Sequence, residues 1–438
     1  MYINVIGAGL AGCEAAMQIA SRGVKVRLYE MKPSKKSPAH KTDLFGELVC
    51  SNSLKAMRVE SAAGLLKEEM RRLGSFLMTC ADKCRVPAGG ALAVDREKFA
   101  QLVTDGIKNN SNIEVINEEI TDLPDDAVTV VATGPLTSDA LASAIEKRFG
   151  DSLSFFDAAA PIVTAESIDM DFAFTASRYD RGGEDDYINC PMNKEEYDTF
   201  YNALVNAERA PLHDFDVSNP KVYEGCMPVE VMAQRGEGTL RFGPMKPVGL
   251  VNPRTGHRPW AVLQLRKENA DGTMYNLVGF QTNLKFPEQK RVFSLIPALH
   301  KADFVRYGVM HRNTFICSPK VLNADYSVKE NKNLFFAGQL MGVEGYMESA
   351  DAGIVAGINA VRRLKGLETV VFPKDTMTGA LEGYVTDETV KKFQPMGANL
   401  GILPELEHRP RDKRERAAAY AERALASLDK FIVENLGD

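Results

Sequence analysis

Residues 2 to 30, YINVIGAGLAGCEAAMQIASRGVKVRLYE, constrain the fold of this chain more than any other stretch. They are typical of a short buried strand, the glycine pattern G-x-G-x-x-G, a helix, and a second strand that ends on Glu30. Gly7 permits the tight turn, Gly9 lets the backbone approach a pyrophosphate, and Gly12 allows close packing of the helix on the strand. The stretch therefore predicts a dinucleotide-binding βαβ unit.

The loop between this strand and helix is where we expect the phosphates of the dinucleotide. The helix N-terminus offers free N–H groups and the positive end of the helix dipole. Glu30 lies 23 residues after Gly7, where a carboxylate can bind a ribose hydroxyl. The predicted cofactor contacts here are Gly7, Ala8, Gly9, Leu10, Ala11, Gly12 and Glu30.

A late segment, NLFFAGQLMGVEGYMESADAGIVAGINAVRRL (333–364), bears on which dinucleotide is bound. It predicts a buried strand, a glycine-rich loop and a helix with small residues on its packed faces. In two-dinucleotide-domain flavoproteins a similar strand and helix return to the first domain and cover the flavin, and VTVVATGPL (128–136) resembles their middle strand. The sequence contains no second G-x-G-x-x-G for a reduced nicotinamide. We therefore expect tightly bound FAD, with Gly338 near it.

The domain organisation follows from a change of pattern in the middle of the chain. Between residues 157 and 325 the βαβ rhythm stops, and Pro, aromatic residues and short alternating runs such as RPWAVLQLRKE appear. The predicted fold class is α/β: a Rossmann-like FAD-binding domain of the two-dinucleotide-domain type in two parts, 1–156 and 326–438, with an inserted α+β substrate domain at 157–325. C-terminal helices, one with Asp412 near its start, end the second part.

Composition excludes several classes of protein. The seven cysteines, at 13, 50, 80, 84, 190, 226 and 317, are an odd number spread over 438 residues, which favours reduced thiols over a disulfide framework. No apolar stretch approaches the roughly 20 residues of a membrane span, and no spacing typical of a zinc site occurs. We expect a cytoplasmic protein with neither a membrane nor a metal as partner. The formal net charge of −6 excludes a globally basic nucleic-acid binder.

Basic residues nevertheless gather in four loop-like stretches: NPRTGHRP (252–259), LKFPEQKR (284–291), YGVMHRNTF (307–315) and EHRPRDKRER (407–416). In an acidic protein such islands have the character of an RNA-backbone footprint, although charged runs are also typical of plain solvated surface. The candidate RNA contacts are Arg254, Arg258, Lys290, Arg291, Arg312, Arg409 and Arg411.

Two cysteines lie in turn-like surroundings. Cys50 stands in GELVCSNSLK, between a short apolar run and small polar residues. Cys226 follows a glycine and precedes Met-Pro, and three cations occur within the next 20 residues. A thiolate nucleophile needs neighbouring cations that lower its pKa, and such a turn can provide them. The alternative for either cysteine is a small buried hydrophobic residue, the usual role of a free cysteine.

Seven motifs of the chain closely resemble the bacterial folate- and FAD-dependent tRNA (uracil-5-)-methyltransferases, over residues 2 to about 405. They are GAGLAG, PAHKTDLFGELVCSNSLK, RVPAGGALAVDREKFA, YINCPM, FGPMKPVGL, YGVMHRNT and GVEGYMESADAG. More loosely, in the flavin domain and the Cys50 loop, the chain resembles the glucose-inhibited division protein A family, which modifies wobble uridines.

The resemblance implies formation of 5-methyluridine at position 54, in the T-loop of tRNA, without S-adenosylmethionine. Methylenetetrahydrofolate would donate the carbon, FAD would carry it, and NAD(P)H would supply electrons. The same resemblance implies Cys226 as the nucleophile toward uracil C6 and Cys50 as the general base. It also implies Tyr346 near the flavin ring and His311 stacked on the folate pterin. The order of the two cysteines and the choice between NADH and NADPH stay open, and we expect no obligate protein partner.

Three other functions stay open from the residues alone. A ribosomal-RNA uracil-5-methyltransferase would use the same chemistry, because target choice lies in surface loops. An NAD(P)H-linked flavin oxidoreductase acting on a small molecule would need neither basic loops nor paired cysteines. A non-catalytic, FAD-stabilised RNA-binding protein would tolerate the loss of both Cys50 and Cys226.

Overall fold

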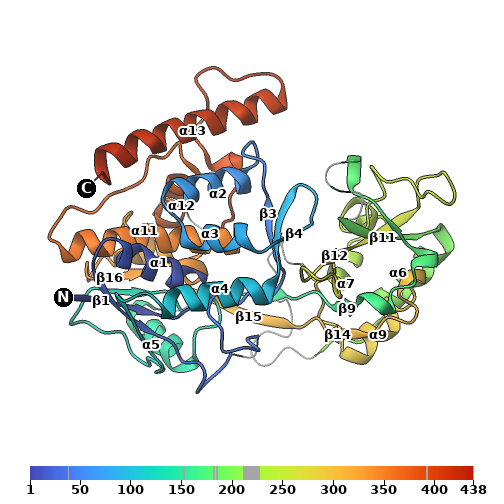
Figure 1. The fold of residues 1–438 in the computed structure, drawn as a ribbon, viewed down its shortest axis with the longest axis horizontal. Coiled ribbons are helices and arrows are strands. Elements are labelled where there is room, and N and C mark those ends of the chain that lie inside the picture. The colour runs from blue at the N-terminus through green and yellow to red at the C-terminus, as the bar shows by residue number, and fades with distance from the viewer. Residues whose placement is uncertain are drawn as a thin grey trace.

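The computed structural model describes residues 1–37, 39–150, 153–180, 183, 186–210, 227–390 and 393–437. Figure 1 shows a first body built on a parallel sheet, an inserted body beside it, and the long helix α13 (Lys413–Asn435) lying across the first body. Asp412 caps α13 by accepting N–H groups of its first turn, as predicted. No helix of the described chain is long and apolar enough to cross a membrane.

A five-stranded parallel sheet, in the order β16-β7-β1-β2-β6, carries the first body. Its strands are β1 (Tyr2–Ile6), β2 (Lys25–Tyr29), β6 (Ile113–Ile116), β7 (Thr129–Val131) and β16 (Leu334–Phe336). Helix α1 (Leu10–Ser21) makes the crossover from β1 to β2. The predicted Rossmann-like sheet, with its last strand supplied by the late segment, is confirmed.

Helix α1 packs on α11 (Tyr346–Leu364) so closely that one position of α11 has no room for a side chain and a second is tight. A Cβ at Gly353 would lie 2.3 Å from the carbonyl oxygen of Ala11, and a Cβ at Gly357 would lie 3.0 Å from that of Ala15. The small residues expected on this helix therefore let α11 pack directly on the N-terminal helix α1.

The inserted body contains a six-stranded antiparallel sheet in the order β10-β11-β12-β13-β9-β14. Its strands are β9 (Ile162–Thr164), β10 (Phe174–Thr175), β11 (Tyr187–Met192), β12 (Ala261–Lys267), β13 (Met274–Leu277) and β14 (Phe304–Arg306). Its helices are α6 (Lys194–Val205), α7 (Val229–Ala233), α8 (Thr239–Phe242) and α9 (Phe286–Phe293). The antiparallel sheet agrees with the predicted architecture, whereas the domain boundaries at 156 and 325 stay predictions. Strand β8 (Leu153–Ala158) pairs with β15 (Met310–Phe315) beside the first boundary.

A small sheet lies between the two bodies (Figure 1). Its strands, in the order β3-β5-β4, are β3 (Ser53–Ala56), β5 (Ala91–Val94) and β4 (Arg85–Val86). The inserted body is hydrogen-bonded to the turn between β4 and β5: the Tyr187 hydroxyl donates to the carbonyl of Ala88 at 2.9 Å, and Asp186 accepts the N–H of Gly89 at 2.7 Å. The small sheet therefore docks the inserted body on the first.

The first body also contains helices α2 (Ala62–Arg72), α3 (Phe76–Lys83), α4 (Arg96–Lys108), α5 (Asp139–Phe149), α10 (Ser318–Val321) and α12 (Met377–Thr386). Two buried carboxylates hold the starts of α3 and α12. Glu69 on α2 accepts the N–H groups of Met377 at 2.8 Å and Thr378 at 2.9 Å, the first two residues of α12. Glu14 on α1 does the same for α3. The positive end of each helix dipole stabilises the negative charge of the carboxylate that contacts it.

Glu69 gives the stability of the fold a pH dependence that one substitution can isolate. Burial raises its pKa from 4.5 to about 7, against the N–H groups that lower it. Between these values the folded chain binds a proton that the unfolded chain has lost, so the contribution of Glu69 to stability falls as pH rises. We expect Glu69→Gln to remove a pH-dependent part of the free energy of unfolding on the order of 3 kcal/mol.

Urea unfolding between pH 4.5 and 7.5 measures this difference. Glu146→Gln, at an exposed position on α5, is the control and should follow the wild-type profile. Parallel profiles for wild type and Glu69→Gln would contradict the expectation.

Candidate functional site

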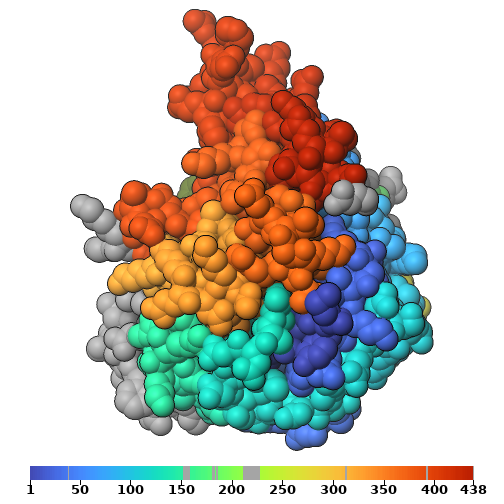
Figure 2. All heavy atoms as spheres, turned by 90° about the vertical axis from the view of Figure 1, so that its left-hand side faces the viewer, coloured from blue at the N-terminus to red at the C-terminus, as the bar shows by residue number. Residues whose placement is uncertain are grey.

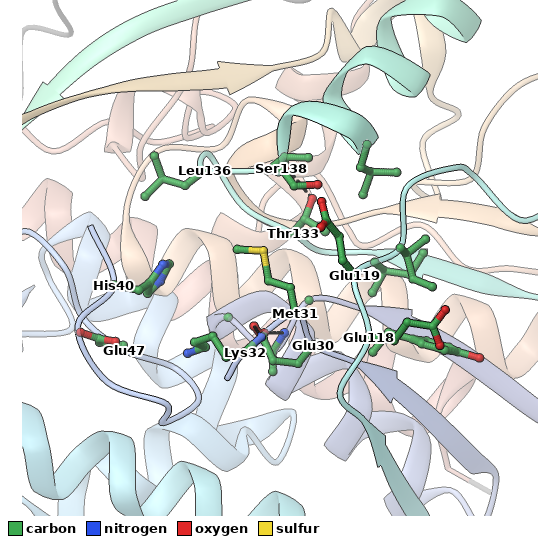
Figure 3. Close-up of a pocket in the computed structure, with 18 residues that line it drawn as sticks. Glu30, Met31, Lys32, His40, Glu47, Glu118, Glu119, Thr133, Leu136 and Ser138 are labelled. Atoms are coloured by element: carbon green, nitrogen blue, oxygen red, sulfur yellow. Dashed lines mark hydrogen bonds between the residues drawn. The ribbon is translucent and has the colours of Figure 1, made fainter. Parts of the chain in front are cut away.

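A cavity of about 630 Å³ opens at the carboxyl ends of β1, β2, β6 and β7 (Figure 3). This is the edge at which an open parallel sheet binds its nucleotide. Its lining includes four of the predicted cofactor contacts: Gly7, Ala8, Gly9 and Glu30. The other three in this motif, Leu10, Ala11 and Gly12, form the first turn of α1.

The glycine loop at this cavity fits a pyrophosphate. Gly7 has φ +98°, a conformation that favours glycine, and a Cβ at Gly12 would lie 1.8 Å from the carbonyl oxygen of Gly7. At Gly9, by contrast, the nearest atom to an added Cβ is 4.0 Å away. Packing within the chain therefore does not require a glycine at position 9. The close approach of a ligand to the backbone does explain it.

Glu30 is buried, and both of its carboxylate oxygens accept backbone N–H groups. Oε2 accepts from Ala8 at 2.8 Å and Oε1 from Lys32 at 3.0 Å. These bonds hold the carboxylate in the cavity wall (Figure 3), and each oxygen keeps a lone pair for a ribose hydroxyl. The donor and acceptor set therefore fits the ribose end of FAD.

A second cavity, of about 1230 Å³, lies against Cys50. Its walls come from residues 49–51 and 53–55, from residues 345–348 at the start of α11, and from Asn313 of β15. Leu136 lines both cavities, so the two are neighbours. A ligand with its phosphates over the glycine loop can extend its ring system toward the thiol.

Tyr346, the first residue of α11, fixes the Cys50 loop. Its hydroxyl accepts the N–H groups of Cys50 at 2.8 Å and Ser51 at 3.2 Å, and lies 2.9 Å from Cys50 Sγ. Because two N–H groups occupy its acceptor sites, the hydroxyl donates its own proton to the sulfur. Burial and the adjacent sulfur raise the pKa of Tyr346 well above its ordinary value, so this proton is retained. A donated hydrogen bond favours the thiolate form of Cys50.

Two arginines contact the same loop. Arg306 Nη2 and Arg96 Nη1 donate to the carbonyl oxygen of Val49 at 2.8 and 3.4 Å. Arg96 also pairs with Glu268 of the inserted body, with Nε 2.5 Å from Oε1. The two guanidinium groups outnumber this carboxylate, and a surplus of positive charge stabilises a thiolate.

Three charged residues at or behind this cavity were not identified from the sequence. Lys55 lies 2.6 Å from the fully buried carboxylate of Glu348 and has φ +64°, which is unusual for a lysine. Lys67 on α2 donates to the carbonyls of Leu54 and Ala63, both at 2.7 Å, and burial lowers its pKa to about 7. The available signal was Glu348 itself, which together with Asp351 is an acid among the mostly small and apolar buried residues of α11.

Some predicted residues lie outside what the structure describes. Cys226 belongs to the stretch 211–226, which is not described, so its meeting with Cys50 stays a prediction. His311 and Arg312 are placed in β15 by their backbone alone. Gly338 is described and lines neither of the two cavities above; a Cβ there would lie 2.8 Å from that of Ala11, so its small size serves the packing on α1.

The remaining basic candidates are exposed and divide between the two bodies. Those of the inserted body are Arg254, Arg258, Lys290 and Arg291, and those near α13 are Arg409 and Arg411. Figure 2 shows the C-terminal region that holds the last two standing out from the first body. Arg291 pairs with Glu288 and Arg409 with Glu405, which weakens the field that each offers to a phosphate.

Comparisons with known proteins define the class. The family described as "Glucose inhibited division protein A" matches residues 2–368. Two crystal forms of GidA from Aquifex aeolicus share 17% identity with the chain and superimpose with TM-scores of 0.71 and 0.67, over 99% and 97% of this chain and 73% and 76% of theirs. The shared fold and the dinucleotide cavity define an FAD-binding flavoprotein of this class.

Proteins named "Methylenetetrahydrofolate--tRNA-(uracil-5-)-methyltransferase TrmFO" are much more similar. That of Acetivibrio thermocellus is 63% identical over 432 residues, 98% of each chain. That of Lactiplantibacillus plantarum is 60% identical over 435 residues, 99% of this chain and 98% of its own. The chain belongs to the family of methylenetetrahydrofolate–tRNA-(uracil-5-)-methyltransferases, which confirms the resemblance drawn from the motifs and, with it, FAD as the cofactor.

The carboxylate of Glu30 provides a test of the first cavity. We expect Glu30→Gln to bind FAD roughly tenfold more weakly, because an amide has one acceptor oxygen and cannot serve two N–H groups and a ribose. Quenching of flavin fluorescence on titration into apoprotein measures the affinity. Glu114→Gln, at an exposed glutamate on the neighbouring strand β6, is the control and should bind FAD as wild type does. Equal affinities for wild type and Glu30→Gln would exclude the assigned role.

Proposed function

We propose that this chain methylates C5 of uridine 54 in the T-loop of tRNA, using methylenetetrahydrofolate as carbon donor and NAD(P)H as reductant, in the cytoplasm. Bound FAD supplies the transfer and redox chemistry that turns the methylene carbon into a methyl group. The observation that carries the proposal is a dinucleotide cavity adjoining a thiol cavity, in a chain 63% identical to a relative of that name.

Cys50 is proposed as the base that removes the C5 proton of uracil. C5 becomes nucleophilic when a thiolate adds to C6, and we assign that addition to Cys226, outside the described residues. As a base, Cys50 must itself be a thiolate, and the Tyr346 hydroxyl together with Arg96 and Arg306 favours that state. The target uridine must leave its stack to reach the thiol cavity.

His311 is proposed to stack on the folate pterin. The support is its place in β15, the strand that also contributes Asn313 to the wall of the thiol cavity. A folate bound there lies beside the ring end of a dinucleotide that extends past Leu136.

The inserted body carries the surface proposed to bind tRNA. Residues 238–258 contain four Lys or Arg and no Asp or Glu, in a chain of net charge −6. Lys246, Arg254 and Arg258 are exposed, and the Phe242 side chain nearby is 88% exposed. Cations neutralise phosphates, and an exposed aromatic ring can stack on an unpaired base, so this composition suits RNA.

Transfer of labelled carbon tests the activity. We expect the wild type to move the methylene label from methylenetetrahydrofolate to uridine 54 of an unmodified tRNA transcript in the presence of NAD(P)H. Cys50→Ala and Cys226→Ala should retain FAD and transfer roughly 100-fold more slowly, because each removes a chemical group. Cys317→Ala, at a half-buried cysteine before α10, is the control and should keep wild-type activity.

Other outcomes of this assay select the alternatives. Label in a ribosomal RNA fragment and none in tRNA would favour the ribosomal methyltransferase. Consumption of NAD(P)H with no labelled RNA would favour a small-molecule flavin oxidoreductase. Full transfer by both cysteine variants would remove the thiols from the mechanism.

Charge reversal tests the RNA surface. We expect Arg258→Glu to weaken tRNA binding roughly tenfold at low salt and to reduce the slope of log affinity against log salt by about one to two, because phosphate contacts release counterions. Filter binding over a salt series measures both quantities. Lys147→Glu, an equal charge change at an exposed position on α5, should cost much less. Equal losses in the two variants would show a general charge effect and contradict the assigned surface.

A further inference from the structure

We propose that Arg266 of the inserted body is a positioning residue for Cys50, because it fixes the two residues that follow the cysteine and so holds the thiol at the Tyr346 hydroxyl. The inference rests on the role proposed above for Cys50 in methyl transfer. It makes the geometry of that thiol depend on the docking of the inserted body.

Arg266 reaches the Cys50 loop with two nitrogens. It is the last residue but one of β12 and is 5% exposed. Its Nε donates to Asn52 Oδ1 at 3.0 Å, and its Nη2 donates to Ser51 Oγ at 2.9 Å. A planar guanidinium spans both acceptors in a fixed geometry, whereas an ammonium group is a single point of charge.

Asn52 connects the loop to both bodies. Its side chain is fully buried, and Nδ2 donates to the carbonyls of Val94 in β5 at 3.0 Å and Lys267 in β12 at 2.9 Å. Its own backbone carbonyl accepts the N–H of Val94 at 3.1 Å. The loop therefore cannot move away from Arg266 without breaking buried hydrogen bonds, which is costly.

The residue before the cysteine is anchored as well. The carbonyl of Val49 accepts from Arg306 of β14 and Arg96 of α4, one from each body. Cys50 thus lies between two anchored residues, with the Tyr346 hydroxyl above its N–H and its sulfur. If the anchor at Ser51 and Asn52 is lost, the N–H groups and the sulfur no longer converge on that hydroxyl.

Several charged and titratable groups line the cavity at Cys50 or neighbour the arginines that contact its loop. They are Lys41, Glu47, Lys55, Arg96, Arg266, Glu268, Arg306, Glu344, Tyr346 and Glu348. Tyr187 also neighbours Arg266. Arg266→Met removes both hydrogen bonds and the positive charge. Arg266→Lys keeps the charge but cannot donate to both acceptors in the geometry of a guanidinium group. The two variants separate the effect of geometry from that of charge.

Alkylation of Cys50 in the FAD-loaded protein reports its environment directly. The tryptic peptide 42–55 contains Cys50 as its single cysteine, so mass spectrometry can follow its reaction with iodoacetamide against pH. We expect Arg266→Met to raise the pH midpoint of the reaction toward about 8.5, the value of an ordinary thiol, with Arg266→Lys in between. Tyr346→Phe should shift the midpoint in the same direction, because it removes the hydrogen bond to the sulfur.

Methyl transfer supplies the second readout. We expect Arg266→Met to lower kcat by about tenfold or more while KM for tRNA stays within about twofold, because a displaced base costs rate and not substrate binding. Arg178→Met is the matched control: Arg178 donates to Gln264 and to the carbonyls of Lys246 and Val248, all within the inserted body. It should keep wild-type kcat and midpoint.

An unchanged midpoint in Arg266→Met, with kcat within twofold of wild type, overturns the proposal. If Arg266→Met loses FAD or fails to fold, Ser51→Ala decides, because it removes a hydroxyl that Arg266 holds: a raised midpoint supports the proposal and an unchanged midpoint overturns it. If the role proposed for Cys50 in methyl transfer is wrong, the result differs from failure of the positioning role. Cys50→Ala would then keep methyl transfer, while Arg266→Met would still raise the pH midpoint.

Discussion

The contact between α1 and α11 is the constraint on which the rest of the structure depends. Because Gly353 and Gly357 carry no side chain, the backbone of α1 can lie directly against α11. That approach joins the first and last segments of the parallel sheet and brings together Cys50 and Tyr346, which are 296 positions apart in the chain. The glycine loop for the dinucleotide and the tyrosine that fixes the thiol therefore belong to one rigid arrangement.

The Cys50 loop is the second place where distant parts of the chain meet, and here the partners are two bodies. Three arginines approach residues 49–52, and Glu268 lies among them. A surplus of charge in a largely buried interface costs desolvation energy and is a weak source of stability. Such a charge surplus shifts the pKa values of neighbouring groups, and shifted pKa values are typical of functional sites. The thiol proposed to act on the target uridine is thus held in part by the body that carries the proposed tRNA surface.

The predictable and unpredictable parts of this site differ in the range of the interactions that make them. The glycine loop and Glu30 could be predicted because turn, helix and ribose carboxylate stand at fixed short spacings in one βαβ unit. Asp412 could be predicted as a helix cap for the same local reason. The hydrogen bond from Arg266 to Asn52 joins residues 214 positions apart. No local sequence pattern indicates which strand packs against the Cys50 loop. The resemblance singled out Tyr346 and Cys50 separately, and only the fold shows that one donates to the other.

The most direct test of the role proposed for Cys50 is whether bound tRNA protects this residue. The target uridine is proposed to enter the cavity that Cys50 lines. Saturating unmodified tRNA should therefore slow the reaction of peptide 42–55 with iodoacetamide several-fold, in FAD-loaded protein at fixed pH. If tRNA binds to the protein while Cys50 reacts at the rate of the free protein, the uridine does not enter this cavity, and the assignment of the thiol to methyl transfer is wrong.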